Sequence, residues 1–226
     1  MQKKHLVKYS IILTCIFALA TGIFLFCKKD TLYIGVVAPL TGEYQGNGEE
    51  MREGIRLYVD ELNRKGGLHG RKVELIVRDD QNDPERAAAI AQELAENTKV
   101  LLVLGHYSSA ASARAGEKYK EFGLPAITSS VTTKAVTNHN NWYFSTTVSN
   151  SDQTELLATY LSKILKHKQV LLIGEKGNIW AESVAESFVK ACEELSFDLP
   201  KVWYFHSDKG KREGLGIRQE MRKRVA

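Results

Sequence analysis

Short apolar runs alternate with amphipathic segments from residue 31 to residue 206, and this alternation predicts a series of strand–helix units. The apolar runs predict strands at 32–38, 73–77, 100–104, 125–128, 142–144, 170–173 and 202–204. Apolar residues at helical spacing predict helices at 49–65, 84–97, 109–122, 152–166 and 181–195. Strands that alternate with helices of this length form parallel sheets covered on both faces, so the predicted fold class is α/β.

Local signals mark the ends of these elements. Asp83, Pro84 and Glu85 supply an N-cap, a first-turn proline and a first-turn acid for the second helix, and Asp152 is expected to cap the fourth. A polar, glycine-bearing loop is expected up to residue 48. The polar stretch 146–152 predicts a crossing between two lobes, which we place at 31–147 and 148–226. The basic tail after residue 208 is expected to be a solvated surface helix.

The N-terminal segment predicts an export signal or a membrane anchor. Three lysines precede residues 9–27, an uncharged run of nineteen residues. Such a run is about one bilayer span long, so residues 1–30 are interpreted as a signal peptide or an anchor. Cleavage after Ala20 would leave an apolar stub, which favours the anchor, and Phe26 before Cys27 fits a lipoprotein signal poorly. An anchor with this charge bias would place the chain after Asp30 outside the cytoplasm.

Composition narrows the class of protein. The chain is 43% hydrophobic and 26% charged, which is ordinary for a globular protein and excludes a disordered chain or a polytopic membrane protein. The formal charge of +4 is carried by residues 1–30, and residues 31–206 hold nineteen Lys or Arg against 23 Asp or Glu. This mildly acidic body gives no electrostatic footprint for nucleic acid. Cys192 is the only cysteine after residue 27, so no disulfide framework, Cys-based zinc site or cofactor is expected.

The loops that follow the strands are where a ligand is expected. Open α/β sheets bind ligands at the carboxyl ends of their strands, which here are followed by residues 39–48, 105–109 and 129–133. Ser109 stands at a predicted helix start, where backbone N–H groups and the helix dipole suit an anion such as a carboxylate. Its hydroxyl would serve equally well as an N-cap, and the sequence leaves both readings open.

Enzyme chemistry finds little support in the sequence. It contains no G-x-S-x-G elbow, no phosphate-binding P-loop and no H-E-x-x-H motif. His106 lies near Ser108 and Ser109, but adjacency along a loop is not the geometry of a catalytic triad. Asp79 and Asp80 are expected to point to opposite faces of a strand end, which predicts a solvated loop or helix-capping role rather than a shared-proton pair. We predict that the protein is not an enzyme.

Several stretches together resemble the periplasmic Leu/Ile/Val-binding protein family, which has the type I periplasmic-binding fold. The stretches follow one another in the family's order and span roughly residues 31–206. They are IGVVAPLTG at 34–42, NRKGGLHG at 63–70, the aspartates of 79–84, GHYSS at 105–109, AITSSVT at 126–132 and SDQ at 151–153. Each piece alone is weak, but the combination is specific.

The resemblance implies two α/β lobes, parallel sheets flanked by helices, that close over a small solute. Carried over by position, Ser109 and Thr132 would hold a ligand carboxylate through hydroxyl and backbone N–H groups, with Ser108 in the same loop. The carbonyl of Ser130 would receive an ammonium group. Trp180 falls where the family places an aromatic that covers the ligand, although it would fit equally well as a core or surface tryptophan. The family's chain continues past residue 226, so the second lobe is expected to be incomplete.

Two functions are compatible with this resemblance. The first is an extracytoplasmic solute-binding protein that delivers a small molecule, such as an amino acid, to the permease of an ABC transporter. The second is the ligand-binding sensor domain of a membrane-anchored receptor with a signalling output domain. Both use the same cleft, and only the N-terminal segment and the chain after Ala226 would distinguish them.

Overall fold

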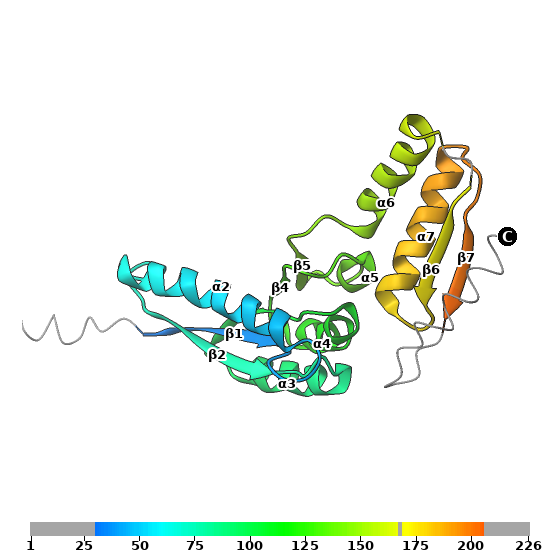
Figure 1. Cartoon of the computed structure of the whole chain (residues 1–226). Helices are drawn as coiled ribbons and strands as arrows, with labels where there is room; N and C mark the ends of the chain where they lie inside the picture. Colours follow the sequence, from blue (N-terminus) through cyan, green and yellow to red (C-terminus); the bar gives the residue numbers. More distant parts are fainter. Residues whose placement is uncertain (1–29, 167–168, 206–226) are drawn as a thin grey trace, which may run out of the picture.

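The computed structural model describes residues 30–166 and 169–205, which form two sheets with their helices (Figure 1). The first region, residues 30–147, has five strands: β1 (Leu32–Ala38), β2 (Val73–Asp79), β3 (Val100–Leu104), β4 (Ala126–Thr128) and β5 (Tyr143–Ser145). Its helices are α2 (Gln45–Arg64), α3 (Pro84–Glu96), α4 (Ser109–Phe122) and the short α5 (Lys134–Thr137). The second region, residues 148–205, contains α6 (Asn150–Thr159), the π-helical turn η1 (Tyr160–Ile164), β6 (Leu171–Glu175), α7 (Ile179–Glu194) and β7 (Lys201–Phe205).

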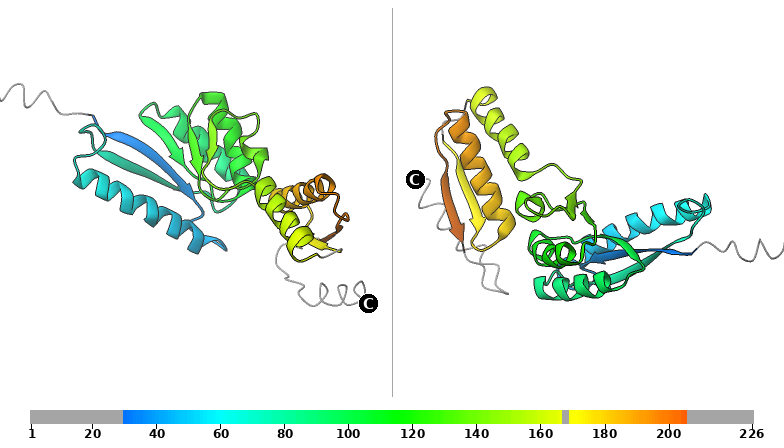
Figure 2. Two further views of the ribbon diagram at one scale, coloured as in Figure 1. Left: turned by 90° about the horizontal axis from the view of Figure 1, so that it is seen from above. Right: turned by 180° about the vertical axis from the view of Figure 1, so that it is seen from behind.

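The first sheet is wholly parallel, with the strand order β2-β1-β3-β4-β5. Helix α2 lies on one face of this sheet, and α3 and α4 lie on the other (Figures 1 and 2). Strand β1 alternates between the two faces, as successive strand residues must. Leu32 and Ile34 pack with the α2 side, whereas Tyr33 and Val37 pack with the α3 and α4 side. Because both faces are covered, β1 is an almost unbroken apolar run.

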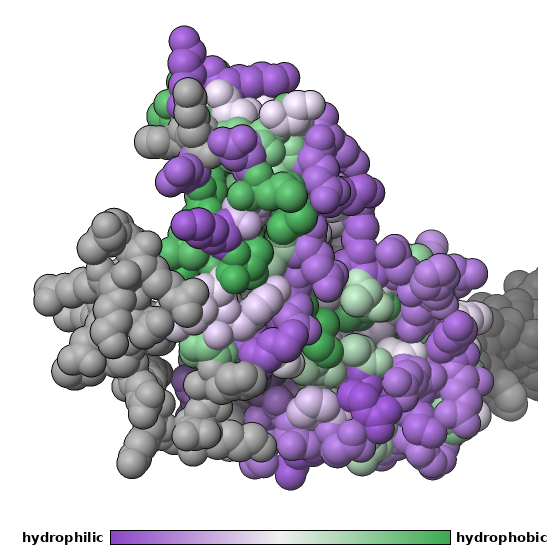
Figure 3. All heavy atoms as spheres, turned by 90° about the vertical axis from the view of Figure 1, so that its right-hand side faces the viewer, coloured by the Kyte–Doolittle hydropathy of each residue, from purple (hydrophilic) through white to green (hydrophobic). Residues whose placement is uncertain are grey.

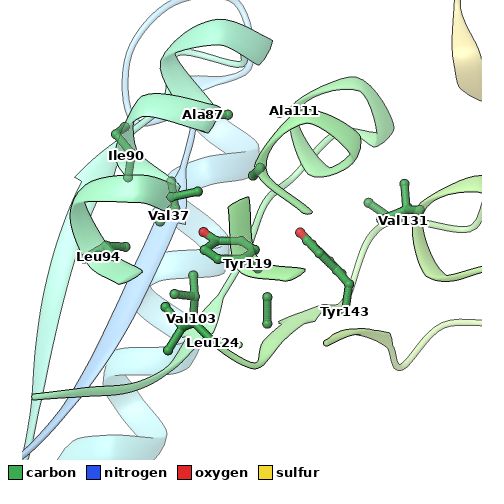
Figure 4. Close-up of a cluster of buried hydrophobic side chains, with 14 of the residues drawn as sticks. Val37, Ala87, Ile90, Leu94, Val103, Ala111, Tyr119, Leu124, Val131 and Tyr143 are labelled. Atoms are coloured by element: carbon green, nitrogen blue, oxygen red, sulfur yellow. The ribbon is translucent and has the colours of Figure 1, made fainter. Parts of the chain in front are cut away.

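The main core lies between the first sheet and helices α3 and α4 (Figure 4). Fifteen buried residues form this cluster, and Tyr119 and Tyr143 are its largest members, with ring centroids 5.9 Å apart. Burial of this much apolar surface is the principal stabilising contribution to the region. The sheet of the first region is therefore a rigid platform for the loops that follow its strands.

The second region is built on a smaller scale. Strands β6 and β7 pair in parallel, α7 packs on their inner face, and α6 packs on α7 (Figure 1). Its buried cluster within the described residues contains four side chains: Ala158, Phe188, Ala191 and Cys192. Ile173 of β6 is 40% exposed. Figure 3 views the molecule from the side of β7 and shows apolar residues gathered on the second region.

Three helix starts differ from the sequence prediction, and the start of α7, at Ile179 instead of residue 181, is one of them. Helix α2 begins at Gln45, inside the predicted loop, because Gly48 packs directly against the chain: a Cβ there would lie 2.0 Å from the carbonyl oxygen of Pro39. The glycine that indicated a loop is thus a point of close backbone contact within the helix. Helix α6 is capped by the hydroxyl of Ser149, which accepts from the N–H of Asp152, so the prediction of an Asp152 cap is wrong.

Other predicted elements are found close to their expected positions. The strand at 32–38 and the helix at 109–122 have the predicted bounds. Asp83 caps α3 by accepting from the N–H of Arg86 at 2.8 Å, and Pro84 is the first helical residue, as predicted. The predicted lobe boundary at 147/148 falls in the segment that connects β5 with α6. The predicted signal or anchor, except for Asp30, and the predicted tail helix lie outside the described residues.

Candidate functional site

A cleft of about 680 Å³ lies between the two regions, and five loops or helix starts line it. On the first region these are the segments after β1, β2, β3 and β4, and on the second region the segment between β6 and α7. The lining includes Tyr44, Asn82, Tyr107, Ser108, Ser109, Ser130, Glu175, Lys176 and Trp180. The cleft is thus at the carboxyl ends of the parallel strands, where the sequence predicted a ligand site, and its size is in the range of small-molecule pockets.

Ser108 and Ser109 form the start of helix α4 at the edge of the cleft. The Ser108 hydroxyl accepts from the N–H of Ala111 at 3.3 Å, so Ser108 is the N-cap. Ser109 is the first helical residue and is largely buried, which corrects the alternative that Ser109 is the cap. The first turn of α4 carries no acidic residue, so the N–H groups and positive dipole end face the cleft without a carboxylate of the helix itself.

Ser130 lies in the same cleft, but its hydroxyl is used within the protein. It donates to the carbonyl of Tyr107 at 2.6 Å and lies 3.4 Å from the carbonyl of His106. These bonds join the loop after β4 to the loop after β3. The predicted role of Ser130, acceptance of an ammonium by its carbonyl, involves the backbone and stays a prediction.

Thr132 and Trp180 connect the two regions. The indole N–H of Trp180, at the start of α7, donates to the hydroxyl oxygen of Thr132 at 3.0 Å. Trp180 is 52% exposed and lines the cleft, so it is a surface tryptophan rather than a core one. A hydroxyl that accepts from an indole keeps its own hydrogen, and Thr132 therefore retains a donor for a ligand oxygen. Four of the five predicted site residues line one cleft, and Thr132 is hydrogen-bonded to one of them.

Asp79, the last residue of β2, and Asp80, which follows it, do not have the predicted solvated or helix-capping roles. Asp80 is fully buried, and its Oδ2 lies 2.6 Å from Nδ1 of His106. Asp79 accepts from the N–H of Leu40 at 2.8 Å and from the hydroxyl of Thr41 at 2.6 Å. Burial alone would raise the pKa of Asp79, but these hydrogen bonds and one from the Gln81 N–H hold it below the ordinary value. Asp79 and Asp80 have different partners and do not share a proton.

His106 is not arranged as a catalytic base for the neighbouring serines. Its Nδ1 contacts Asp80, and its Nε2 lies 3.0 Å from the hydroxyl of Tyr119. The side chain is fully buried and is not among the residues that line the cleft. With both ring nitrogens engaged, His106 has none left to activate Ser108 or Ser109.

Sequence reasoning did not identify several residues that line the cleft. Tyr44 and Tyr107 pack with ring centroids 5.8 Å apart. Oδ1 of Asn82 is buried and has no hydrogen-bond partner among the described residues. Asn82 precedes the helix cap Asp83, and this place in a loop after a strand is the only sequence signal for it. No group of His, Cys, Asp and Glu side chains in residues 30–166 and 169–205 is arranged to hold a metal ion.

Comparison with known proteins decides the family. The model of a family described as periplasmic binding protein matches residues 31–205, most of the chain. The chain belongs to the periplasmic binding protein family. The two parallel sheets flanked by helices confirm the predicted fold class, of which the chain covers a part. Membership of this family implies a location outside the cytoplasm, and in the described part of the chain no helix has the length and apolar character needed to span a bilayer.

Relatives of this periplasmic binding protein carry names that refer to amino acids. An amino acid binding protein of Pseudomonas aeruginosa is 33% identical over 63% of the chain, and the Leu/Ile/Val-binding protein BraC3 of Rhizobium johnstonii is 30% identical over 69%. The matches cover 38% and 42% of those proteins, so the chain spans about two fifths of their length. A crystal structure of the branched-chain amino acid transporter substrate binding protein LivJ from Streptococcus pneumoniae, in complex with isoleucine, is similar with a TM-score of 0.73 and 26% identity. This similarity covers 85% of the chain and 54% of LivJ.

Proposed function

We propose that this chain is part of an extracytoplasmic solute-binding protein that binds an amino acid or a related small molecule in the cleft and delivers it to an ABC transporter. The convergence of Ser109, Thr132 and Trp180 carries the proposal. They come from three elements and two regions: Ser109 and Trp180 line one cleft, and Thr132 is hydrogen-bonded to Trp180. The names of the relatives, which refer to amino acids and to a transporter, support this ligand class and partner.

The geometry supports recognition of a carboxylate on the first region. The N-terminus of α4 presents backbone N–H groups, the Ser109 side chain lies beside them, and the hydroxyl of Thr132 keeps a free hydrogen. Hydrogen bonds to a charged group are stronger than those between neutral groups. Trp180, from the second region, then covers the bound molecule. Ligand contacts with both regions would favour the closed arrangement, which is how such a binding protein signals its loaded state.

The test is a titration of the full-length protein with each of the twenty L-amino acids by calorimetry. Ser109→Ala and Thr132→Ala are each expected to weaken binding by about ten- to a hundredfold, because each removes a hydrogen bond to a charged group. The melting temperature of the unliganded protein should hardly change. Thr98→Ala is the matched control, because Thr98 is exposed in the turn before β3, at the opposite end of that strand from the cleft.

Either of two results would contradict the proposal. Wild-type affinity in both cleft variants would place the ligand elsewhere. Failure of every amino acid to bind would reject amino acids as the ligand class. No observation on the described residues favours the sensor alternative over the transport function.

A further inference from the structure

A row of buried polar side chains lies beneath the binding loop at 105–109. The imidazole of His106 connects the carboxylate of Asp80, at 2.6 Å from Nδ1, with the hydroxyl of Tyr119, at 3.0 Å from Nε2. All three side chains are fully buried. Asp80 follows β2, His106 follows β3 and Tyr119 lies on α4, so the row joins three elements. We refer to it as the Asp80–His106–Tyr119 relay of hydrogen bonds.

The contacts of this relay fit one tautomer of His106. Oδ1 of Asp80 accepts from the N–H of Asn82 at 2.9 Å, and Oδ2 faces Nδ1 of His106, so a hydrogen on Nδ1 has an acceptor there. Burial raises the pKa of Tyr119 well above its ordinary value of 10.0, and the Tyr119 hydroxyl therefore keeps its proton. In the tautomer with its hydrogen on Nδ1, Nε2 of His106 accepts a hydrogen bond from this hydroxyl. With the Nδ1–H tautomer, every polar hydrogen of the three side chains has an acceptor.

The backbone of residues 105–107 is fixed from the same side. A Cβ on Gly105 would lie 2.3 Å from the carbonyl oxygen of Val37, so the loop passes directly against β1. The hydroxyl of Tyr143 donates to the carbonyl of Gly105 at 2.7 Å and accepts from the N–H of His106 at 2.8 Å. The Thr128 hydroxyl donates to the carbonyl of His106 at 2.9 Å. The loop is therefore held by groups from β1, β4, β5 and, through the imidazole, β2 and α4.

We propose that Asp80, His106 and Tyr119 are positioning residues of the cleft. Their hydrogen bonds set the orientation of residue 106 and hence that of Ser108 and Ser109, which follow it at the start of α4. This inference rests on the proposed function of the cleft as a small-molecule site. A loop that is already ordered does not have to be ordered by the ligand, so the relay raises affinity without touching the bound molecule.

A purely structural role would be filled more simply by apolar side chains. Tyr119 belongs to a core cluster that is otherwise almost wholly apolar (Figure 4). Burying a carboxylate and an imidazole costs free energy even when the two are paired. Polar groups add directionality, because hydrogen bonds fix the orientation of the His106 imidazole and apolar contacts do not. The position that gains from this direction is residue 106, two residues before Ser108.

The first test removes one hydroxyl. Tyr119→Phe keeps the ring of Tyr119 in the core and leaves Nε2 of His106 without its donor. In the full-length protein we expect about tenfold weaker binding of the L-amino acid that binds wild type most tightly. Ile90→Val is the matched control, because it removes one methylene from the same cluster and touches no group of the relay. It should lower the melting temperature and leave affinity unchanged. Equal affinity of Tyr119→Phe and wild type would overturn the proposal.

A second variant separates the two ends of the relay. His106→Asn places an amide N–H near the position of Nδ1 and keeps the bond to Asp80, whereas it gives up the contact with Tyr119. The expected loss of affinity equals that of Tyr119→Phe, and the double variant should lose no more than either single one. Additive losses would show that the two residues act separately and would contradict a connected relay.

A third readout needs no ligand, so it remains decisive if no amino acid binds. Nitrogen-15 NMR of the imidazole in the unliganded protein should show the neutral Nδ1–H tautomer of His106, and Tyr119→Phe should shift the Nε2 resonance. Amide hydrogen exchange at residues 106–111 should accelerate in Tyr119→Phe and remain at the wild-type rate in Ile90→Val. An Nε2–H tautomer, or exchange unaffected by Tyr119→Phe, refutes the relay whatever the cleft binds. If the wild-type protein binds no amino acid, that result by itself refutes only the proposed function.

Discussion

The first region buries a cluster of fifteen residues and a network of polar side chains, whereas the cluster of the second region, within the described residues, has four members. The cleft takes its helix N-terminus and its serines from the first region, and Trp180 with the segment before it from the second. The two regions therefore contribute unequally to the cleft. The first region presents the start of α4 and its serines on a rigid sheet. The second region, which has a smaller core, supplies Trp180 as the cover of the cleft.

The largest expected effect comes from the small core. Phe188→Ala removes the largest side chain of the four-residue cluster and should cost about 3–5 kcal/mol, because the surrounding side chains relax only partly into the cavity. Hydrogen exchange resolved by segment should show that residues 148–205 unfold first while the first sheet stays protected. Leu94→Ala, in the fifteen-residue cluster, is the counterpart and should weaken protection of the first region. Simultaneous unfolding of both regions in Phe188→Ala would show that they are one cooperative unit.

A smaller effect is expected where the regions meet. The hydroxyl of Ser183 on α7 accepts from the hydroxyl of Thr133 at 2.9 Å and from the amide of Asn150 at 3.1 Å, and both donors are buried. Ser183→Ala leaves these donors unpaired and should shift the equilibrium toward a more open arrangement by about 1–3 kcal/mol. Small-angle scattering of the unliganded protein would show a larger radius of gyration.

The control for the contact between regions is on the same helix. Ser187→Ala changes a serine one turn further along α7, whereas the hydrogen bonds from α7 to the first region are made by Ser183 and Trp180. Its radius of gyration should equal that of wild type. An unchanged radius in Ser183→Ala would mean that the indole of Trp180 and the apolar contacts are sufficient to hold the regions together.

The smallest expected effect distinguishes the carboxylates of the two regions. The pKa of Asp79 is lowered mainly by neutral donors acting against burial, whereas the pKa of Glu182 is lowered first by its hydrogen bond with the exposed Lys176. Both carboxylates stabilise the folded state above the ordinary carboxyl range, and both contributions are lost as the pH falls through the lowered pKa values, below about pH 4. Added salt screens the attraction between the charges of Lys176 and Glu182 more than the hydrogen bonds from neutral donors to Asp79.

This comparison can be measured by acid titration followed by NMR at low and high salt. The apparent pKa of Glu182 should rise toward its ordinary value of 4.5 at high salt, while that of Asp79 should stay below 3.8. Asp79→Asn should remove the pH dependence of the NMR signals around Thr41 at acid pH, because the hydroxyl of Thr41 donates to this carboxylate. An equal response of both carboxylates to salt would contradict the assignment of their causes.

Local patterns predicted most of the fold. Buried parallel strands are unbroken apolar runs, and the Asp83-Pro84 helix start depends only on neighbouring residues, so both are visible in the sequence. The start of α2 was not predictable, because the role of Gly48 depends on the carbonyl of Pro39, which approaches only in the folded chain. Local signals therefore give the elements and lose accuracy where tertiary contacts decide an end.

The candidate site was predictable only in part, for a related reason. The cleft residues follow strands, and the rule that ligands bind at strand ends placed Ser109 and Ser130 correctly at one cleft. Asp80 and His106 are 26 residues apart and follow β2 and β3, which are not neighbours because β1 lies between them. Their contact depends on the strand order of the sheet. No periodicity or spacing in the sequence contains that order.

The reactivity of the buried Cys192 thiol is a chemical measure of how often the core of the second region opens. It is the single cysteine of the described residues, it belongs to the four-residue cluster, and burial raises its pKa, so both access and thiolate formation oppose reaction with an alkylating reagent. Alkylation then requires the cluster to open, so the rate of alkylation reports how often the cluster opens. A small molecule that draws the two regions together would slow the labelling of a residue it never touches.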